Sequence, residues 1–88
     1  KKKLSPIIIV YPYYPESAVA AELQGTVIVS FQTHGDCTIS NIVITKSLSS
    51  DCDKEAIEAI KKYGELYKKY GVDCEEKTET KEIIFKLD

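Results

Sequence analysis

The segment from Thr26 to Gln32 constrains the fold more than any other part of the chain, because its side chains alternate between an apolar and a mainly polar face. The two faces are Val27, Val29 and Phe31 against Thr26, Ile28, Ser30 and Gln32. A period of two predicts a β-strand. A sheet with one apolar face needs a cover, and 88 residues suffice for one domain only.

A second strand is predicted from Thr38 to Lys46, after a turn rich in polar residues. Ile42 and Ile44 share a face, whereas Ile39 is out of phase with them. This offset predicts a bulge or a strong twist near Ser40-Asn41. Because the connecting loop is short, we expect the two strands to form an antiparallel hairpin.

Two amphipathic helices are predicted to cover the sheet. The first runs from Glu16 to Leu23. The second begins around Cys52, after a cap at Ser50 or Asp51. Its apolar stripe covers more than four turns and comprises Ala56, Ile57, Ile60, Tyr63, Tyr67 and Tyr70. Gly64 lies inside this helix and costs about 1 kcal/mol relative to alanine.

The end of the chain predicts a loop and then a third strand. Residues 73–81 are charged and lack periodicity, which indicates a loop, and Glu82 to Leu87 alternate as a strand. One face carries Ile83, Phe85 and Leu87, and the other carries Ile84 and Lys86. We therefore predict an α+β fold, ordered helix-strand-strand-helix-strand. Its antiparallel three-stranded sheet has the order two-one-three, is covered on one face by two helices, and ends in an edge strand.

The first 15 residues are punctuated by Pro6, Pro12 and Pro15. Prolines exclude a central strand, so Ile7 to Val10 form an edge strand or an extended lead-in. We interpret Lys1 to Lys3 as a solvated terminus. The predicted organisation is a lead-in over residues 1–13 and a folded domain over residues 14–88.

The three cysteines, Cys37, Cys52 and Cys74, form no CxxC pair. A disulfide between Cys52 and Cys74 would bracket the long helix and add about 3 kcal/mol, but the sequence leaves open whether any disulfide forms. We expect no zinc site, since His34 and Cys37 would need two distant cysteines to complete it. His34 is predicted to be an exposed turn residue.

The remaining residues do not predict an enzyme. We find no nucleophile with a base and an orienting group, no glycine-rich phosphate loop and no cofactor motif. The net charge of −2 and the lack of a basic stripe argue against nucleic acid as a partner. No segment approaches the roughly 18 apolar residues of a membrane span. Six tyrosines remain. Three are expected in the helix stripe, and Tyr11, Tyr13 and Tyr14 either bind a partner or pack over the sheet edge.

Five segments in order resemble the C-terminal domain family of TonB energy transducers. They are Tyr14-Pro15, the Ala-rich run Ser17 to Ala21, the Gly-x-Val-x-Val-x-Phe strand Gly25 to Phe31, Ile39 to Ser47 with its Ser-Asn and Lys-Ser pairs, and Asp53 to Ile60 with Asp-x-x-Ala-x-x-Ala. The turn Gly35-Asp36-Cys37 departs from the Pro-Asp-Gly that is common in the family. Tyr63 to Tyr67 also lacks the proline that usually ends the second helix.

The resemblance implies a periplasmic domain, anchored to the inner membrane by an upstream segment and coupled to motor proteins there. It further implies that the domain captures an extended peptide of an outer-membrane transporter by strand addition. The residues we expect to bind this partner are Tyr11, Tyr13, Tyr14, Glu82, Ile83, Ile84, Phe85, Lys86 and Leu87. The alternative is a self-associating domain of another envelope protein, a homodimer in which Ile7 to Val10 pair between chains.

Overall fold

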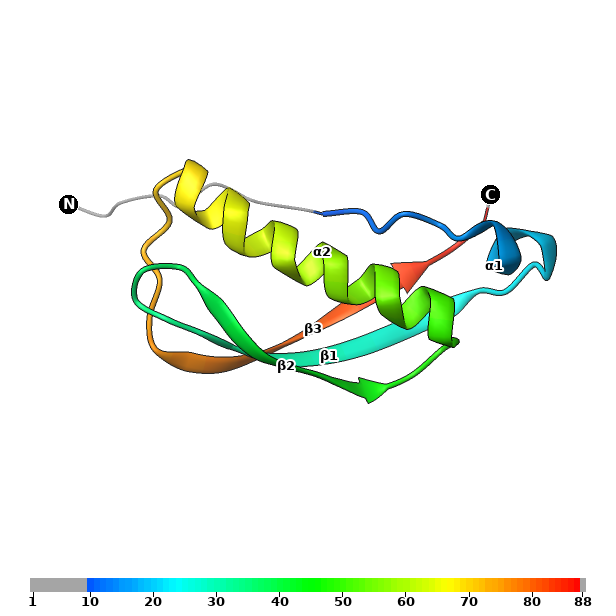
Figure 1. Ribbon diagram of the computed structural model, residues 1–88, viewed down its shortest axis with the longest axis horizontal. Coiled ribbons are helices and arrows are strands. Elements are labelled where there is room, and N and C mark those ends of the chain that lie inside the picture. Colours follow the sequence, from blue (N-terminus) through cyan, green and yellow to red (C-terminus); the bar gives the residue numbers. More distant parts are fainter. Residues whose placement is uncertain (1–9, 88) are drawn as a thin grey trace.

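The computed structural model describes residues 10–87 (Figure 1). Lys1 to Lys3 and Ile7 to Ile9, whose conformation the sequence predicts, lie outside this range. The elements are α1 (Glu16–Ala20), β1 (Gly25–Thr33), β2 (Ile39–Lys46), α2 (Ser50–Lys69) and β3 (Lys77–Phe85). The predicted α+β class and the order helix-strand-strand-helix-strand are confirmed.

The sheet has the predicted order β2-β1-β3, and both neighbouring pairs are antiparallel. Figure 1 shows α2 lying along one face of the sheet and α1 beside its end. The core fills the space between α2 and the sheet, where Phe31, Ile60 and Phe85 are almost completely buried. The apolar face predicted from the alternation in β1 is the one that packs against the helix, since Val27 and Val29 are also buried.

Of the bulge or strong twist predicted in β2, the register of the hairpin shows a bulge. Ser30 faces Val43 and Gln32 faces Ser40, so β2 contributes one extra residue over this step. Asn41 takes up the irregularity with a φ of 52°, in the left-handed region that asparagine tolerates better than most residues. A second register shift occurs between Ile28 and Val29.

β3 begins at Lys77, so the predicted loop over residues 73–81 is wrong in its second half. From Lys77 to Lys81 the charged residues lie on one face of the strand and the threonines on the other, so this segment has no apolar period. Pairing with β1 needs only backbone groups, and the register runs without interruption from Gly25 opposite Phe85 to Thr33 opposite Lys77. Lys86 and Leu87, which we predicted in this strand, lie beyond its end.

The helix ends differ from the prediction by a few residues. α1 stops at Ala20 and not at Leu23, because Glu22 adopts a φ of 51° that a right-handed helix cannot continue. α2 is capped by Ser49, whose hydroxyl accepts a hydrogen bond of 3.1 Å from the Cys52 amide. The cap is therefore neither Ser50 nor Asp51, both of which lie inside the helix.

A disulfide joins Cys37 to Cys74, and Cys52 is a buried free thiol. The pairing of Cys52 with Cys74, which the sequence left open, does not form. α2 has 20 residues, which corresponds to a length of about 30 Å, and the two cysteines stand at its opposite ends. A disulfide requires Cα atoms within about 7 Å. Cys37, in the β1–β2 turn, lies beside the other end of the helix, with its Cα 5.3 Å from that of Cys74.

Candidate functional site

β3 forms one edge of the sheet. It pairs with β1 on one side, and within residues 10–87 no strand pairs with its other side. In an antiparallel pair, alternate residues of an edge strand turn both backbone groups outward, where they remain available to another chain. Within residues 10–87 this row of backbone groups has no strand partner and is a candidate interaction surface.

The lead-in to α1 runs along the same side of the molecule. The Val10 amide donates a hydrogen bond of 3.3 Å to the Tyr63 hydroxyl of α2. The Tyr14 hydroxyl donates to the carbonyl of Leu23, and the Tyr14 ring meets the Phe85 ring edge-on at a centroid distance of 5.5 Å. Partial burial raises the pKa of the Tyr14 phenol, which keeps it protonated as a donor. These contacts hold the segment between Val10 and Tyr14 at both ends.

A groove of about 370 Å³ separates the lead-in from the end of β3. It is lined by Val10, Tyr11, Pro12, Tyr63, Glu82, Ile83, Ile84 and Lys86. Tyr11 is 83% exposed and Ile84 is 60% exposed, so both present apolar surface to solvent at the groove. The groove can therefore accept an apolar side chain from a segment lying on the β3 edge.

The structure gathers some of the expected site residues and separates others. Tyr11 lies with Glu82, Ile84 and Lys86 around the groove. Tyr13 does not line this groove but lines a second hollow with Glu58 and Lys62, which Tyr11 also borders. Tyr14 packs inward. The side chains of Ile83 and Phe85 are buried in the core, so these two residues offer only backbone to a partner.

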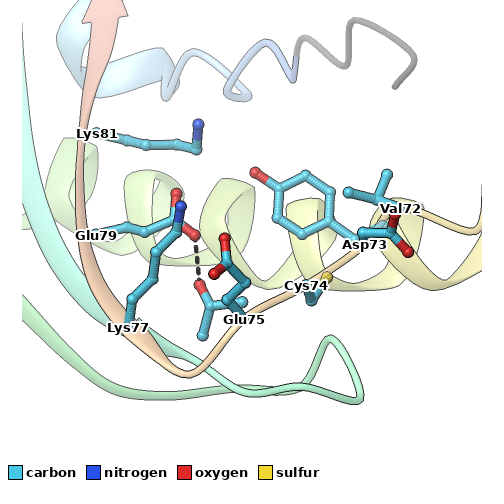
Figure 2. A pocket seen from close by; sticks show the side chains of 9 residues that line it. Val72, Asp73, Cys74, Glu75, Lys77, Glu79 and Lys81 are labelled. Carbon is cyan, nitrogen blue, oxygen red and sulfur yellow. Dashed lines mark hydrogen bonds between the residues drawn. The ribbon is translucent and has the colours of Figure 1, made fainter. Parts of the chain in front are cut away.

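The first half of β3 carries charged residues that the sequence analysis did not include among the candidate site residues. Figure 2 shows Lys77, Glu79 and Lys81 projecting from β3 on the same side, at the rim of a pocket of about 280 Å³. The buried Thr33 hydroxyl donates a hydrogen bond of 2.6 Å to Glu79 Oε2. The Lys81 ammonium lies 4.7 Å from the centroid of the Tyr63 ring. The sequence feature that could have indicated this part of the strand is a charged residue at every second position from Lys77 to Lys81.

Tyr67 of α2 lines the same pocket. Burial raises the pKa of its phenol, and the nearby Lys81 ammonium partly opposes that shift. The hydroxyl is thus protonated at neutral pH and adds no charge to the pocket. The electrostatics of this end of β3 are therefore set by its own lysines and glutamates and by the carboxylates of the preceding loop.

The turn between β1 and β2 clamps the segment that leads into β3. Besides the disulfide, Glu76 accepts a hydrogen bond of 2.8 Å from the Gly35 amide, and His34 Nδ1 lies 3.1 Å from both of its carboxylate oxygens. The Gly35 N–H and, secondly, His34 lower the pKa of Glu76. His34 also contacts the Ser40 hydroxyl at 2.7 Å, so the prediction of a simply exposed histidine is wrong.

The arrangement offers backbone pairing and side-chain contacts, and Cys37 cannot serve a metal while its sulfur is in the disulfide. In the part of the chain that the structure describes, no three His, Cys, Asp or Glu side chains are grouped so that they could hold a metal ion. Neither described helix combines the length and the apolar character needed to cross a membrane.

An open sheet edge beside a groove, on a small α+β scaffold, defines the class of a protein-interaction domain. The family model for the Gram-negative bacterial TonB protein C-terminal matches residues 10–87, nearly the whole chain. The chain belongs to this family, as the resemblance of its motifs predicted. Neither a curated protein nor a solved structure matches it. The chain is therefore a TonB-type periplasmic domain, of a family that serves transport and energy transduction and is not known for enzymes.

Proposed function

We propose that this domain binds an extended segment of an outer-membrane TonB-dependent transporter by adding it to β3 as a fourth strand, and so supports active transport. The observation that carries the proposal is the unbroken register of β3 with β1 over nine consecutive pairs. A strand that is regular on its paired side presents a regular row of donors and acceptors on its free side. An extended peptide can satisfy that row without any rearrangement of the domain.

The groove beside Tyr11 supports the proposal with a place for side chains. Each backbone hydrogen bond contributes only about 0.5–1.5 kcal/mol net, and such bonds do not distinguish one sequence from another. Apolar contacts with Tyr11, Ile84 and the Tyr63 ring would add affinity and sequence preference at the C-terminal half of β3. The expected complex is one of moderate affinity, suited to a partner that is captured and released.

The proposal also includes the wider setting of an energy transducer. In it, a segment upstream of this chain anchors the protein to the inner membrane and contacts motor proteins there. Force applied through that anchor would reach the sheet through the lead-in. The lead-in is fastened to the domain by the Val10 contact with Tyr63 and by the packing of Tyr14 on Phe85.

The experiment is a titration of the isotope-labelled domain with a synthetic peptide from the N-terminal segment of a TonB-dependent transporter, followed by amide chemical shifts. We expect the largest shifts in β3 and around Tyr11, and small shifts in β2. Tyr11→Ala should weaken binding several-fold, because this ring lines the groove. Tyr70→Ala is the matched control, since Tyr70 is also an exposed tyrosine but lies at the end of α2. Shifts centred on β2 would contradict the proposal.

A further inference from the structure

The first half of β3 carries charges of alternating sign on the side that faces α2. Lys77, Glu79 and Lys81 have the same facing as Ile83 and Phe85, whose side chains are buried against the helix. The contacts agree with this placement, because Glu79 bonds to Thr33 beneath the helix and Lys81 lies over the Tyr63 ring of α2. Along this side, the edge therefore reads positive, negative, positive and then apolar.

Two of the three charges are held in place before any partner arrives. The Glu79 carboxylate is fixed by the hydroxyl of Thr33, which is 1% exposed, and the Lys81 ammonium is fixed by the Tyr63 ring. Both side chains are half-buried, and Lys77 is exposed. Charges that are already ordered lose little side-chain freedom when they form an ion pair. They can therefore discriminate between partners more strongly than mobile surface charges do.

We propose that the β3 edge selects an extended segment whose side chains on the helix-facing side are acidic, basic and acidic at alternate positions, opposite Lys77, Glu79 and Lys81, with an apolar side chain two positions further at the groove beside Ile83. The proposal rests on strand addition at β3 and names the chemistry of the segment that is added. Directly opposite side chains on paired strands have their Cβ atoms about 4.5–5.5 Å apart, within reach of an ion pair.

The alternation also fixes the register of the added strand. A slip of one residue turns the whole triad to the other face of the sheet. A slip of two residues sets an acidic side chain opposite Glu79 and a basic one opposite a lysine, which is repulsive. The triad reads the same in both directions, so the apolar residue alone reports strand direction. It follows the triad in a parallel segment and precedes it in an antiparallel one.

A second copy of this chain is a poorer match to the same edge. Antiparallel pairing of β3 with itself over its full length centres on Lys81 and sets two lysines opposite each other. Centring the pair on Thr80 allows Glu79 to face Lys81 twice, but it leaves Lys77 opposite Ile83. The complementary triad satisfies all three charges, and for this reason we assign the edge to a separate peptide.

The test uses two synthetic nine-residue peptides that differ only in charge order. One carries Asp, Lys and Asp at alternate positions followed by Leu, and the other carries Lys, Asp and Lys followed by Leu; reversed-order versions of both test direction. Binding is measured by amide shifts on the intact chain. We expect the first peptide to bind about tenfold more tightly, as the reversal of three cross-strand ion pairs implies. The preference should shrink as salt is raised.

The matched variant is Lys77→Glu/Glu79→Lys/Lys81→Glu, which should prefer the second peptide. If circular dichroism shows that this variant does not fold, Lys77→Glu alone changes an exposed side chain and should reduce the preference about two- to threefold. Equal binding of both peptides at β3 would overturn the charge rule and leave strand addition standing. No shift in residues 77–85 with any peptide would overturn strand addition itself. A dimer that the first peptide does not dissociate would assign the edge to a second copy and overturn the proposal.

Discussion

The two edges of the sheet are built differently. β3 keeps nine consecutive pairs with β1, whereas the register of β2 shifts twice along its length. Ile83 and Phe85 anchor β3 with side chains that are 2% and 1% exposed, whereas no residue of β2 is buried to that degree. A bulged, twisted edge resists pairing with another chain, and a regular edge invites it. One edge of this sheet, β2, is therefore protected against pairing, and the other edge, β3, is open.

The protection of β2 has a local cause. Asn41 takes the left-handed conformation, and its side-chain amide donates a hydrogen bond of 3.1 Å to Gln32 Oε1. This bond holds the extra residue of β2 against β1, and the exposed backbone of the edge is bent there. β3 has no such interruption, since its register with β1 is continuous from Lys77 to Phe85.

The largest expected effect is a difference in stability between variants of the two edge strands, which measures how firmly each strand is anchored in the core. Phe85→Ala removes a buried ring and should lower the free energy of unfolding by about 3–5 kcal/mol. Ile44→Ala, on the core side of β2 but only half-buried, should cost roughly 1–2 kcal/mol. Denaturant unfolding of both variants measures the difference. Equal losses would show that β2 is anchored as firmly as β3.

The second effect concerns the covalent link between the two edge regions. The disulfide ties the turn before β2 to the segment before β3, with a sequence separation of 37 residues. Cys37→Ser/Cys74→Ser should lower stability by about 2–4 kcal/mol, because the unfolded chain regains its freedom. Denaturant unfolding with and without a reductant measures this loss. Cys52→Ala retains the disulfide, so a reductant must still destabilise it.

A smaller effect tests how α2 approaches the β2 side. A Cβ at Gly64 would lie 3.2 Å from Ile39 Cδ1 and 3.4 Å from the Cys37 carbonyl oxygen. Gly64→Ala should therefore forfeit the gain of about 1 kcal/mol that alanine normally brings to a helix interior. Thermal unfolding is expected to show no stabilisation. Adding Ile39→Val removes the nearest atom, so stabilisation by Gly64→Ala measured within the Ile39→Val background would support the steric explanation.

The smallest effect is the pH dependence of the clamp before β3. The pKa of Glu76 is lowered by the Gly35 N–H and then by His34. A depressed pKa means that the carboxylate stabilises the fold above its ordinary pKa and loses this contribution as the pH falls through the lowered value. The melting temperature of Glu76→Gln should therefore fall below that of the parent chain at neutral pH and converge with it in acid. His34→Gln should retain most of this difference, since the Gly35 contact is the larger cause.

The sequence by itself determined the elements and their order. A period of two fixed the facing of β1, because the face that is buried must be apolar wherever the element lies. The helical stripe fixed the buried side of α2 through Ala56, Ile60 and Tyr63, whereas Tyr70, predicted in the same stripe, lies beyond the helix and is 55% exposed. The offset of Ile39 predicted a bulge or a strong twist in β2, again because the buried face must be apolar. The expected partner surface at the end of β3 followed from the edge position of that strand and from the resemblance to the TonB C-terminal family.

Only the tertiary structure decided what depends on a distant segment. β3 begins at Lys77 because β1 extends to Thr33 and supplies the opposite backbone, and a charged strand carries no apolar period to announce it. Cys74 pairs with Cys37 because α2 holds Cys52 a helix length away. Tyr11 lines the groove beside β3 and Tyr13 does not, in a lead-in that is fastened through Val10 and Tyr14. Local periodicity records which side of an element is buried, but the identity of its neighbour is a property of the whole chain.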